Sequence, residues 1–486
     1  MKKIVVPLVL LFTTFIILFS FTVPLIEKDS PPNIIFILSD DHSSLAIGSY
    51  GSEYIKTPHI DRLASEGVRF NNAFVVSSLC SPSRAAILTS QYGAESRFLK
   101  IGDALDTSLN TLPKSLQKSN YETAIIGKWH LRSTPVGFDY CQVVRDQGAF
   151  FNPVFFTNQE WDNKDKKGEP GEGYFTDIIT DKAIAWLENR RSDKPFALFV
   201  HHKSPHAPHI TPEKYDSLYT RDFPVPFNFN EDYTNKTSFL RENENPYSKL
   251  QNAYESDIFN DLKNKKAPDN IKRGTLAYKE WAYQTLLKGY SRQIANLDEN
   301  IGKLLSYIDK KGLNKKTIVV YTSDNGWFLG QHGLFNKMWM YEESLRVPLI
   351  MRYSGHIAKN KINDQFISSL DFAPTLLDYA GSTIPHSMRG QSFKPILEGK
   401  KQVKWRKTFF YHYYDQFGVP EIMGLRTEQY KLIQYLRGEK SEWELYDLEK
   451  DPHEMNNQIN NPDLADIVKQ LKNNLKEEKN KYEPKQ

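Results

Sequence analysis

The sequence predicts an α/β protein with a large doubly wound, mixed but mostly parallel sheet and a smaller C-terminal α+β subdomain built on an antiparallel sheet. In the first 400 residues, short apolar runs alternate with helical patterns, and after about residue 400 short aromatic segments take their place. Of the 486 residues, 40% are hydrophobic and 25% are charged. That composition supports a packed core and excludes a wholly disordered chain.

The strands of the large sheet are predicted from five apolar runs that are continuous rather than alternating, which is typical of strands buried on both faces. These runs cover residues 34–38, 123–126, 196–200, 318–321 and 348–351. Helical patterns between them cover residues 61–66, 83–90, 177–188 and 279–309. Strands that alternate with helices in this way predict parallel pairing with helices on both faces of the sheet.

The chain divides into three predicted parts. Residues 1–26 form a targeting segment, residues 31–398 the catalytic α/β domain, and residues 399–486 the C-terminal subdomain. Aromatic strands are expected there at residues 408–414, 421–427, 430–435 and 442–446, followed by a charged helix at 463–481. Residues 228–275 are rich in Asn, Asp, Glu and Lys and are predicted to be a surface insertion.

The N-terminus indicates export. Lys2 and Lys3 precede an apolar run over residues 4–26, as in a secretory signal. The run also approaches the ~20 residues of a membrane span, so an uncleaved anchor is the alternative, and only then would the protein be attached to a membrane. We expect a periplasmic or secreted protein. With 63 basic and 59 acidic residues, the net charge of +4 is too balanced for nucleic-acid binding through phosphates.

Polar residues follow four of the predicted strands at the point where each strand ends. Ligands of open α/β sheets bind beyond these carboxyl ends. The first strand is followed by Asp40 and Asp41, and the fourth by Asp324 and Asn325. Adjacent carboxylates repel each other, and these hard oxygen donors favour Ca²⁺, with Mg²⁺ as the alternative. The other two strand ends carry Lys128 with His130, and the segment that contains His206.

A second candidate site is the start of the helix predicted near residue 83. Pro82 suits the first turn, and Cys80 and Arg84 are four residues apart, so they share one helix face. A helix N-terminus with an arginine favours an anion beside the cysteine. The chain has two cysteines, so the alternatives for Cys80 are a buried apolar role or a disulfide with Cys141.

The segment Cys80-Ser81-Pro82-Ser83-Arg84 resembles the Cys-x-Pro-x-Arg motif of type I, formylglycine-dependent sulfatases of the alkaline-phosphatase-like superfamily. The resemblance extends over nearly the whole chain. It is carried by residues 33–41, 57–61, 127–130, Lys337 with 341–344, and 445–448. Residues 137–140 and 148–153 look most like polysaccharide-acting members, including N-acetylglucosamine-6-sulfatases.

The resemblance implies that a maturation enzyme oxidises Cys80 to formylglycine. One hydroxyl of the hydrated aldehyde attacks sulfur, and the second later expels sulfate. It also implies roles for individual residues. Metal ligands are expected at Asp40, Asp41, Cys80, Asp324 and Asn325. Arg84 and Lys128 are expected to hold the formylglycine and the sulfate charge, Lys337 to contact a sulfate oxygen, His130 to act as the base and His206 as the general acid.

Several alternatives remain at this point. Lys128 and Lys337 are surface lysines in the simplest interpretation, and His201, His202 and His209 compete with His206. Ser133 is a candidate near the sulfate by position, and His332 a supporting group. The expected substrate is a sulfated oligosaccharide, from a glycosaminoglycan or from an algal polysaccharide such as ulvan. Specificity is expected in residues 207–275 and at His412, Tyr413 and Tyr414. The alternative functions are a phosphonate or phosphate monoester hydrolase and an unmodified glycan-binding homologue.

Overall fold

A computed structural model describes residues 30–163, 165–191, 193–243 and 267–482. The predicted targeting segment 1–26 and residues 244–266 of the predicted insertion lie outside these ranges. Within the described ranges, no helix combines the length and the apolar character needed to cross a membrane. From Pro31 onward the chain forms one compact unit.

The core of the molecule is a ten-stranded mixed sheet with the strand order β11-β2-β10-β9-β1-β8-β4-β5-β6-β7. Its strands are β1 (Asn33–Ser39), β2 (Val68–Phe70), β4 (Glu122–Lys128), β5 (Tyr140–Val144), β6 (Val154–Phe156), β7 (Glu169–Pro170), β8 (Phe196–His201), β9 (Thr317–Ser323), β10 (Leu349–Arg352) and β11 (Lys361–Asn363). The five central strands, β9-β1-β8-β4-β5, are all parallel to their neighbours. The predicted α/β fold is confirmed, because this sheet and the small C-terminal sheet are both present.

The direction predicted for one strand is wrong. Residues 348–351 were expected to form another parallel strand, but β10 is antiparallel to β9, with Leu349 opposite Thr322. A parallel strand would need a crossover that returns the chain to the opposite end of the sheet. The connection from β9 to β10 instead stays at the carboxyl end of β9, and its one α-helix, α10 (Glu342–Leu345), has four residues.

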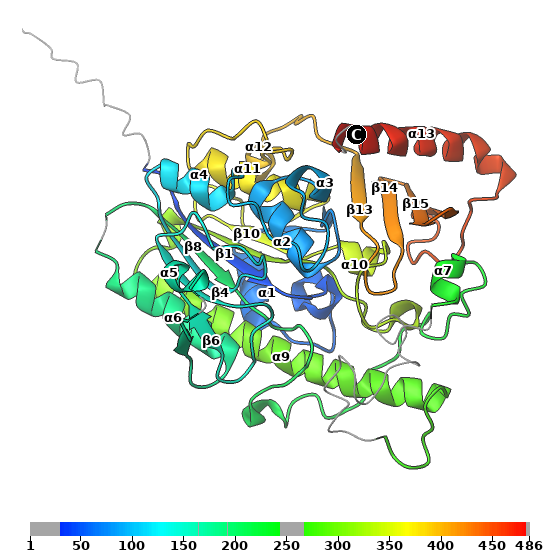
Figure 1. Ribbon diagram of the computed structural model, residues 1–486, viewed down its shortest axis with the longest axis horizontal. Coiled ribbons are helices and arrows are strands. Elements are labelled where there is room, and N and C mark those ends of the chain that lie inside the picture. The colour runs from blue at the N-terminus through cyan, green and yellow to red at the C-terminus, as the bar shows by residue number, and fades with distance from the viewer. Residues whose placement is uncertain (1–29, 164, 192, 244–266, 483–486) are drawn as a thin grey trace, which may run out of the picture. The chain divides into compact units, whose positions relative to one another are not determined.

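Helices cover both faces of the sheet, with α2, α4 and α11 on one side and α1, α6 and α9 on the other (Figure 1). Apart from α10, the helices of the described residues are α1 (Pro58–Ser65), α2 (Cys80–Thr89), α3 (Gly93–Ser96), α4 (Leu112–Lys118), α5 (Asn158–Trp161), α6 (Phe175–Asn189), α7 (Ser238–Arg241), α9 (Leu276–Lys310), α11 (Phe372–Tyr379), α12 (Lys394–Leu397) and α13 (Ala465–Tyr482). Short 3₁₀ helices lie at Ser44–Ala46, Gly48–Tyr50, Glu213–Tyr215, Asn314–Lys316, Gln331–Gly333, Ser369–Asp371 and Pro462–Leu464.

The alternation of side chains in β1 explains why its sequence is a continuous apolar run. Phe36 and Leu38 pack under the α2 side of the sheet, while Ile35 and Ile37 pack under the α9 side. All four are fully buried. A strand that is buried on both faces needs apolar residues at every position, so the run predicts the central place of β1 in the sheet.

The C-terminal segment forms a four-stranded antiparallel sheet, with α13 beside it (Figure 1). Its strands are β13 (Thr408–Tyr413), β14 (Glu421–Thr427), β15 (Tyr430–Arg437) and β16 (Lys440–Asp447). A two-stranded sheet pairs β3 (Ala73–Phe74) with β12 (Ile367–Ser368). One buried cluster joins the four-stranded sheet to residues of the large domain, including Phe74 and Trp339. The domain boundary drawn at residue 399 stays a prediction.

Residues 228–243 of the predicted insertion are less exposed than their composition indicates, whereas residues 267–275 are mostly exposed. Phe229, Tyr233 and Leu240 are buried. The backbone N–H of Thr237 donates to Glu444 Oε1 on β16. Residues 228–243 are therefore held against the C-terminal sheet and are not a free surface loop.

Candidate active site

The ends of four neighbouring strands bring the predicted metal ligands and bases together. Asp40 and Asp41 follow β1, Lys128 is the last residue of β4, and Asp324 directly follows β9. The loop after β8 carries His206. The carboxyl ends of parallel strands meet at one edge of a sheet, which explains why residues almost 300 positions apart in the sequence share this site.

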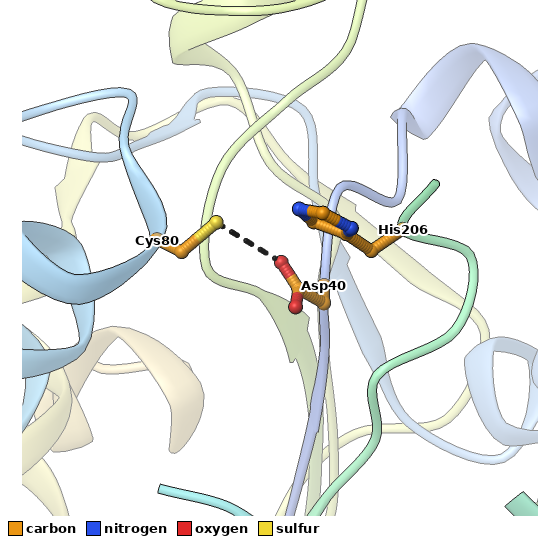
Figure 2. Close-up of side chains that lie close together, drawn as sticks. All are labelled: Asp40, Cys80 and His206. Atoms are coloured by element: carbon orange, nitrogen blue, oxygen red, sulfur yellow. Dashed lines mark hydrogen bonds between the residues drawn. The ribbon is translucent and has the colours of Figure 1, made fainter. Parts of the chain in front are cut away.

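The N-terminus of α2 supplies the candidate nucleophile. Cys80 is the first residue of the helix, and Leu79 before it is extended. Arg84 is one turn further on, so both side chains face the strand ends. The Cys80 side chain points toward Asp40 and His206 (Figure 2), and its thiol donates to Asp40 Oδ1 at 3.3 Å. Cys80 and Cys141 are both unpaired, so the disulfide alternative is wrong.

Three cations surround the three carboxylates in what we call the rim cluster: Asp40, Asp41, Asp324, Arg84, Lys128 and Lys337. Arg84 Nε donates to Asp324 Oδ2 at 2.8 Å and Arg84 Nη1 to the Lys128 carbonyl at 2.9 Å. Lys128 donates to Asp40, and Lys337 donates to Asp41. Lys337 Nζ is also 2.8 Å from Cys80 Sγ. Both lysines are buried, so the surface-lysine alternative is wrong for each of them.

The backbone at the rim is constrained. Asp41 and His130 both have left-handed φ angles, 66° and 60°. Left-handed backbone costs a non-glycine residue of order 1–3 kcal/mol, and such residues concentrate at functional sites. Gly127, before Lys128, has a φ of 115°, and a Cβ there would collide with the His201 carbonyl. The fold therefore holds these side chains in place at a local energetic cost.

The buried charges shift one another's pKa values. Burial alone would raise the pKa of Asp40, but the cations around it, Lys128 foremost, outweigh burial and hold the pKa well below its usual range. Asp324 is shifted in the opposite direction, because burial and then the Asp40 charge raise its pKa to about 7. Burial also raises the pKa of the Cys80 thiol. Three carboxylates this close favour the binding of additional positive charge.

The carboxylates fit a divalent cation. One oxygen each from Asp40, Asp41 and Asp324 lie within 4.8 Å of one another. Asp41 Oδ2 and Asn325 Oδ1 are buried and accept no hydrogen bond from the described residues. All of these donors are hard oxygens, which suit Ca²⁺ or Mg²⁺. The rim cluster is formally neutral as it stands, so a dication would also give it the positive charge that an anionic substrate requires.

Of the four candidate histidines at the end of β8 and in the loop after it, only His206 lines the cavity beside Cys80. Its Nε2 atom is 3.6 Å from Asp41 Oδ2, and burial lowers its pKa to about 4. His201 instead contacts the Lys128 carbonyl at 3.3 Å, and His209 packs against Tyr290 and Phe335. His202 is fully buried as well.

His130 does not line the cavity itself and reaches it through Gln147. Gln147 Nε2 is 3.4 Å from His130 Nε2, and Gln147 Oε1 accepts from Lys128 Nζ. Burial, and then the charge of Lys128, lower the pKa of His130, so its imidazole is neutral in this state. The sequence analysis missed Gln147, although it directly precedes the segment 148–153 that carried part of the resemblance.

The cavity beside Cys80 has a volume of about 260 Å³. Most other lining residues that the sequence analysis missed are apolar, among them Ile101, Trp327, Met338 and Phe417, and one, Asn336, is polar. The side chain of Gln416 joins two of the lining loops, because it accepts from the N–H of Ile101 at 3.0 Å and donates to the carbonyl of Ile101 at 3.0 Å. No local pattern in the sequence marks this pair.

Other predicted residues lie away from the cavity. His412 and Tyr413 are buried in β13, where His412 Nε2 is 2.9 Å from Glu421 Oε1 and Tyr413 donates to the Gln416 carbonyl. Phe417, four residues after Tyr413, lines the cavity in their place. His332 is paired with Glu231 at 2.6 Å.

Ser133 also lies outside the lining of the cavity, where its carbonyl accepts from the indole N–H of Trp129. Its position beside the sulfate therefore has no support.

The chain matches known proteins over almost its full length. A sulfatase family model matches residues 32–382, and a model of the C-terminal region of N-sulphoglucosamine sulphohydrolase matches residues 330–481. An N-acetylglucosamine-6-O-sulfatase of Bacteroides thetaiotaomicron is 38% identical over 94% of this chain and 88% of its own length. An ulvan-active sulfatase of Formosa agariphila is 28% identical over 92% of this chain and 81% of its own length.

Solved structures agree with these matches. A protein in complex with its substrate D-glucosamine-2-N,6-O-disulfate superposes with a TM-score of 0.84 at 36% identity, covering 93% of this chain and 98% of that one. A phosphonate monoester hydrolase of Agrobacterium radiobacter shares the fold, with a TM-score of 0.73 at 21% identity over 93% of this chain and 96% of its own. Since the sulfatase model spans well over half of the sequence, this chain belongs to the sulfatase family and is a sulfuric ester hydrolase.

Proposed function

We propose that the protein is an exported carbohydrate sulfatase that removes the 6-O-sulfate from a glucosamine or N-acetylglucosamine residue of a sulfated oligosaccharide. The similarity to an N-acetylglucosamine-6-O-sulfatase and to a structure holding D-glucosamine-2-N,6-O-disulfate supports the choice of sugar and position. One observation on this chain carries the chemistry. A cysteine at a helix N-terminus lies within hydrogen-bond distance of a carboxylate and a lysine, at the floor of a cavity of about 260 Å³. A cavity of this size accommodates one sugar ring with its sulfate, and its apolar lining suits the ring.

Cys80 is the proposed site of formylglycine, made by a separate maturation enzyme. The hydrated aldehyde supplies two hydroxyls on one carbon, one to attack sulfur and one whose proton loss releases sulfate. Arg84 and Lys337 both lie beside Cys80, so their charges stabilise negative charge at that carbon and on the sulfate oxygens. An unmodified thiol is poorly suited to attack, because burial raises its pKa.

A Ca²⁺ ion is the proposed cofactor, with Mg²⁺ as the alternative, held by Asp40, Asp41, Asp324 and Asn325 together with the oxygen that replaces the Cys80 sulfur. The cation supplies positive charge that polarises the sulfate oxygens. Lys128 and Arg84 hold Asp40 and Asp324 in place through direct hydrogen bonds.

His206 and His130 are the proposed proton carriers. His206 lines the cavity, so it protonates the departing sugar oxygen, and the negative charge of a bound sulfate raises the imidazole pKa from its low value of about 4. His130 is the proposed base for the proton that leaves during sulfate release, and the side chain of Gln147, 3.4 Å away, orients its imidazole. The apolar lining contributed by Phe417 and Ile101 contacts the sugar ring.

Export through the N-terminal segment remains part of the proposal. Its support is the pair of lysines ahead of the apolar run over residues 4–26. The test is the N-terminal sequence and the cell fraction of the protein in its native organism. A chain that begins at residue 1 and stays in the cytoplasm would contradict it.

The first experiment measures the mass of the tryptic peptide that contains Cys80, from protein produced with its own maturation enzyme. Conversion to formylglycine lowers the mass by roughly 18 Da, and hydration restores the mass of one water. The Cys141 peptide from the same digest is the control, because Cys141 lies outside the motif. An unchanged Cys80 thiol in active protein would contradict the proposed nucleophile.

The second experiment compares N-acetylglucosamine 6-sulfate with N-acetylglucosamine 6-phosphate as substrates at equal concentration. We expect kcat/KM for the sulfate ester to be at least 100-fold higher. A preference for the phosphate ester, or for a methyl phosphonate monoester, would favour the related hydrolase activity. Faster release of sulfate from galactose 6-sulfate or from an ulvan oligosaccharide would contradict the proposed sugar.

A further inference from the structure

A second cavity shares no lining residue with the one beside Cys80. It is lined by the loop after β1, by residues 226–228, by the connection from β9 to β10, and by residues 452–453. Its volume is about 360 Å³. Leu45 and Phe227 form an apolar edge, and Asn228, Glu343 and His453 contribute polar groups. None of these residues lines the cavity near Cys80. The second cavity therefore has no role in the sulfatase chemistry described above.

The aromatic edge of this cavity is unusually open. Phe227 is 71% exposed, more than any other large hydrophobic residue among those the structure describes. Its ring contacts that of His453 edge-on, with 4.8 Å between the ring centroids, so one face of the phenyl ring stays accessible. Exposing an apolar ring to water is unfavourable, and such a ring beside a cavity indicates a ligand that covers it.

The polar groups in the lining have unused hydrogen-bonding capacity. Asn228 is only 3% exposed, yet neither its Oδ1 nor its Nδ2 has a hydrogen-bond partner among the described residues. Glu343 Oε2 is also buried without a partner there. Unsatisfied buried polar groups cost about 1–3 kcal/mol each. Asn228 offers a donor and an acceptor, and the carboxylate offers acceptors, which together match the vicinal hydroxyls of a sugar.

The charge of the lining selects among possible sugars. Glu342 and Glu343 both line the cavity, and the single arginine there, Arg346, is paired with Glu342. Glu343 Oε2 lies 4.0 Å from His332 Nε2, and the two carboxylates and one guanidinium of the lining sum to one negative charge. A sulfate or a uronic acid carboxylate would be repelled by that charge. An uncharged ring that donates hydroxyl protons and lays its apolar face on Phe227 is favoured.

We infer that this second cavity is a binding site for an uncharged, unsulfated sugar residue, held by Phe227, Asn228 and Glu343. Such a site recognises neutral parts of a glycan independently of the sulfate removed beside Cys80. The inference rests on the proposed function only for the expectation that glycans are encountered. The binding itself follows from the lining.

The test is saturation-transfer NMR of the full-length Cys80→Ala protein with four neutral probes, the methyl pyranosides of glucose, galactose, mannose and N-acetylglucosamine. We expect at least one probe to bind. Phe227→Ala should weaken that probe's affinity at least tenfold, and Glu343→Gln at least threefold. Tyr54→Ala, which removes another aromatic ring with 55% exposure that lies outside this lining, is the matched control and should leave the affinity unchanged.

Two results would overturn the inference. The first is the absence of any probe binding that depends on Phe227. The second is equal or tighter Phe227-dependent binding of galactose 6-sulfate, which would contradict the charge argument. Phe227 is exposed, so its replacement does not threaten folding, and thermal unfolding of each variant checks this. Because Cys80→Ala protein carries out no reaction, loss of binding is distinguishable from failure of the proposed sulfatase chemistry.

Discussion

The molecule contains two clusters of buried charge that use the same residue types for different purposes. The rim cluster leaves the carboxylate oxygen Asp41 Oδ2 without a hydrogen-bond donor among the described residues, and the same holds for Asn325 Oδ1 next to Asp324. The second group, here the C-terminal charge cluster, contains Glu342, Glu444, Glu454, Lys236, Lys431 and Arg426. Glu444 in that cluster accepts from Tyr341 at 3.0 Å, from Tyr435 at 2.8 Å and from the Thr237 N–H.

The difference lies in what satisfies the carboxylates. In the C-terminal charge cluster, Glu342 receives Lys431 at 2.9 Å and Arg426 at 3.3 Å, and these cations outweigh burial to hold its pKa well below the usual range. In the rim cluster, burial raises the pKa of Asp324 to about 7 despite Arg84 beside it. The pKa shifts alone do not separate the clusters, because Asp40 in the rim cluster is also lowered and Glu454 in the C-terminal charge cluster is also raised. The difference is in the ion pairs: Glu454 Oε1 is 2.7 Å from Lys431 Nζ, whereas Asp41 Oδ2 in the rim cluster has His206 Nε2 as its neighbour at 3.6 Å and keeps acceptor capacity for a ligand.

The largest expected effect is a loss of activity at Cys80 without a loss of stability. Cys80→Ala should lower kcat by about 10⁴-fold, because the nucleophile is lost, while the thermal unfolding temperature stays close to that of the wild type. Cys141→Ala is the matched control, a buried cysteine outside the site. The measurement is sulfate release from N-acetylglucosamine 6-sulfate. Retention of more than a hundredth of the activity would contradict the role of Cys80.

The C-terminal charge cluster should respond in the opposite way. Lys431→Met removes the cation that contacts both Glu342 and Glu454, and should lower the free energy of unfolding by about 3–5 kcal/mol because two carboxylates stay buried without it. The kcat/KM of the folded fraction should remain within about twofold. Lys450→Met, which removes an exposed lysine near Asp447, is the control and should change stability by less than about 0.5 kcal/mol.

Removing the proposed cation from the rim cluster should lower both the activity and the stability of the protein. Chelation with EDTA followed by dialysis should abolish activity and lower stability by about 3 kcal/mol relative to protein with Ca²⁺ at 100 times its Kd. Calcium should restore both, as measured by calorimetry with and without the ion. Asp324→Asn should show a much smaller calcium-dependent shift. A wild-type protein whose unfolding temperature is insensitive to chelation would contradict the proposed ligand set.

A smaller effect is expected at Gln147, which connects Lys128 to His130. Gln147→Ala should reduce kcat by about 10–100-fold, since groups that orient a reacting residue typically contribute that much. KM should change less than kcat if Gln147 acts through His130. Gln365→Ala, at an exposed position, is the control. An unchanged kcat in Gln147→Ala would argue against the proposed orienting role of Gln147.

The smallest effect is the contribution of Glu442, two residues before Glu444 of the C-terminal charge cluster, to stability at acid pH. Burial alone would raise the pKa of Glu442, but hydrogen bonds from Ser238 and Thr237 outweigh burial and lower it to about 2, from an ordinary 4.5. The ionised form therefore stabilises the fold above pH 4.5, and that stability is lost as the pH falls toward 2. Glu442→Gln should remove less than about 1 kcal/mol of this dependence, because the side chain is partly exposed.

The sequence predicts four of the five central strands, β9, β1, β8 and β4, because each is buried on both faces and its apolar run is continuous. It missed β5, whose run is interrupted by Gln142. Two short strands at one end of the sheet, β6 with three residues and β7 with two, were missed because such short runs carry no clear strand pattern. The geometry of Cys80 and Arg84 is local, since a spacing of four residues on a helix fixes it. The position of Phe417 beside Cys80 depends on contacts between residues about 300 positions apart, which no local pattern encodes.

The bridge between Gln416 and Ile101 has a consequence for how the protein is made. The first of the two loops that it joins is synthesised early and the second among the last, yet both line the cavity beside Cys80. A nascent chain that still lacks the β13–β14 hairpin has the nucleophile and most of the ionic groups but no complete binding pocket. Translation must therefore pass residue 417 before this pocket exists, so fragments truncated earlier should lack a complete substrate site.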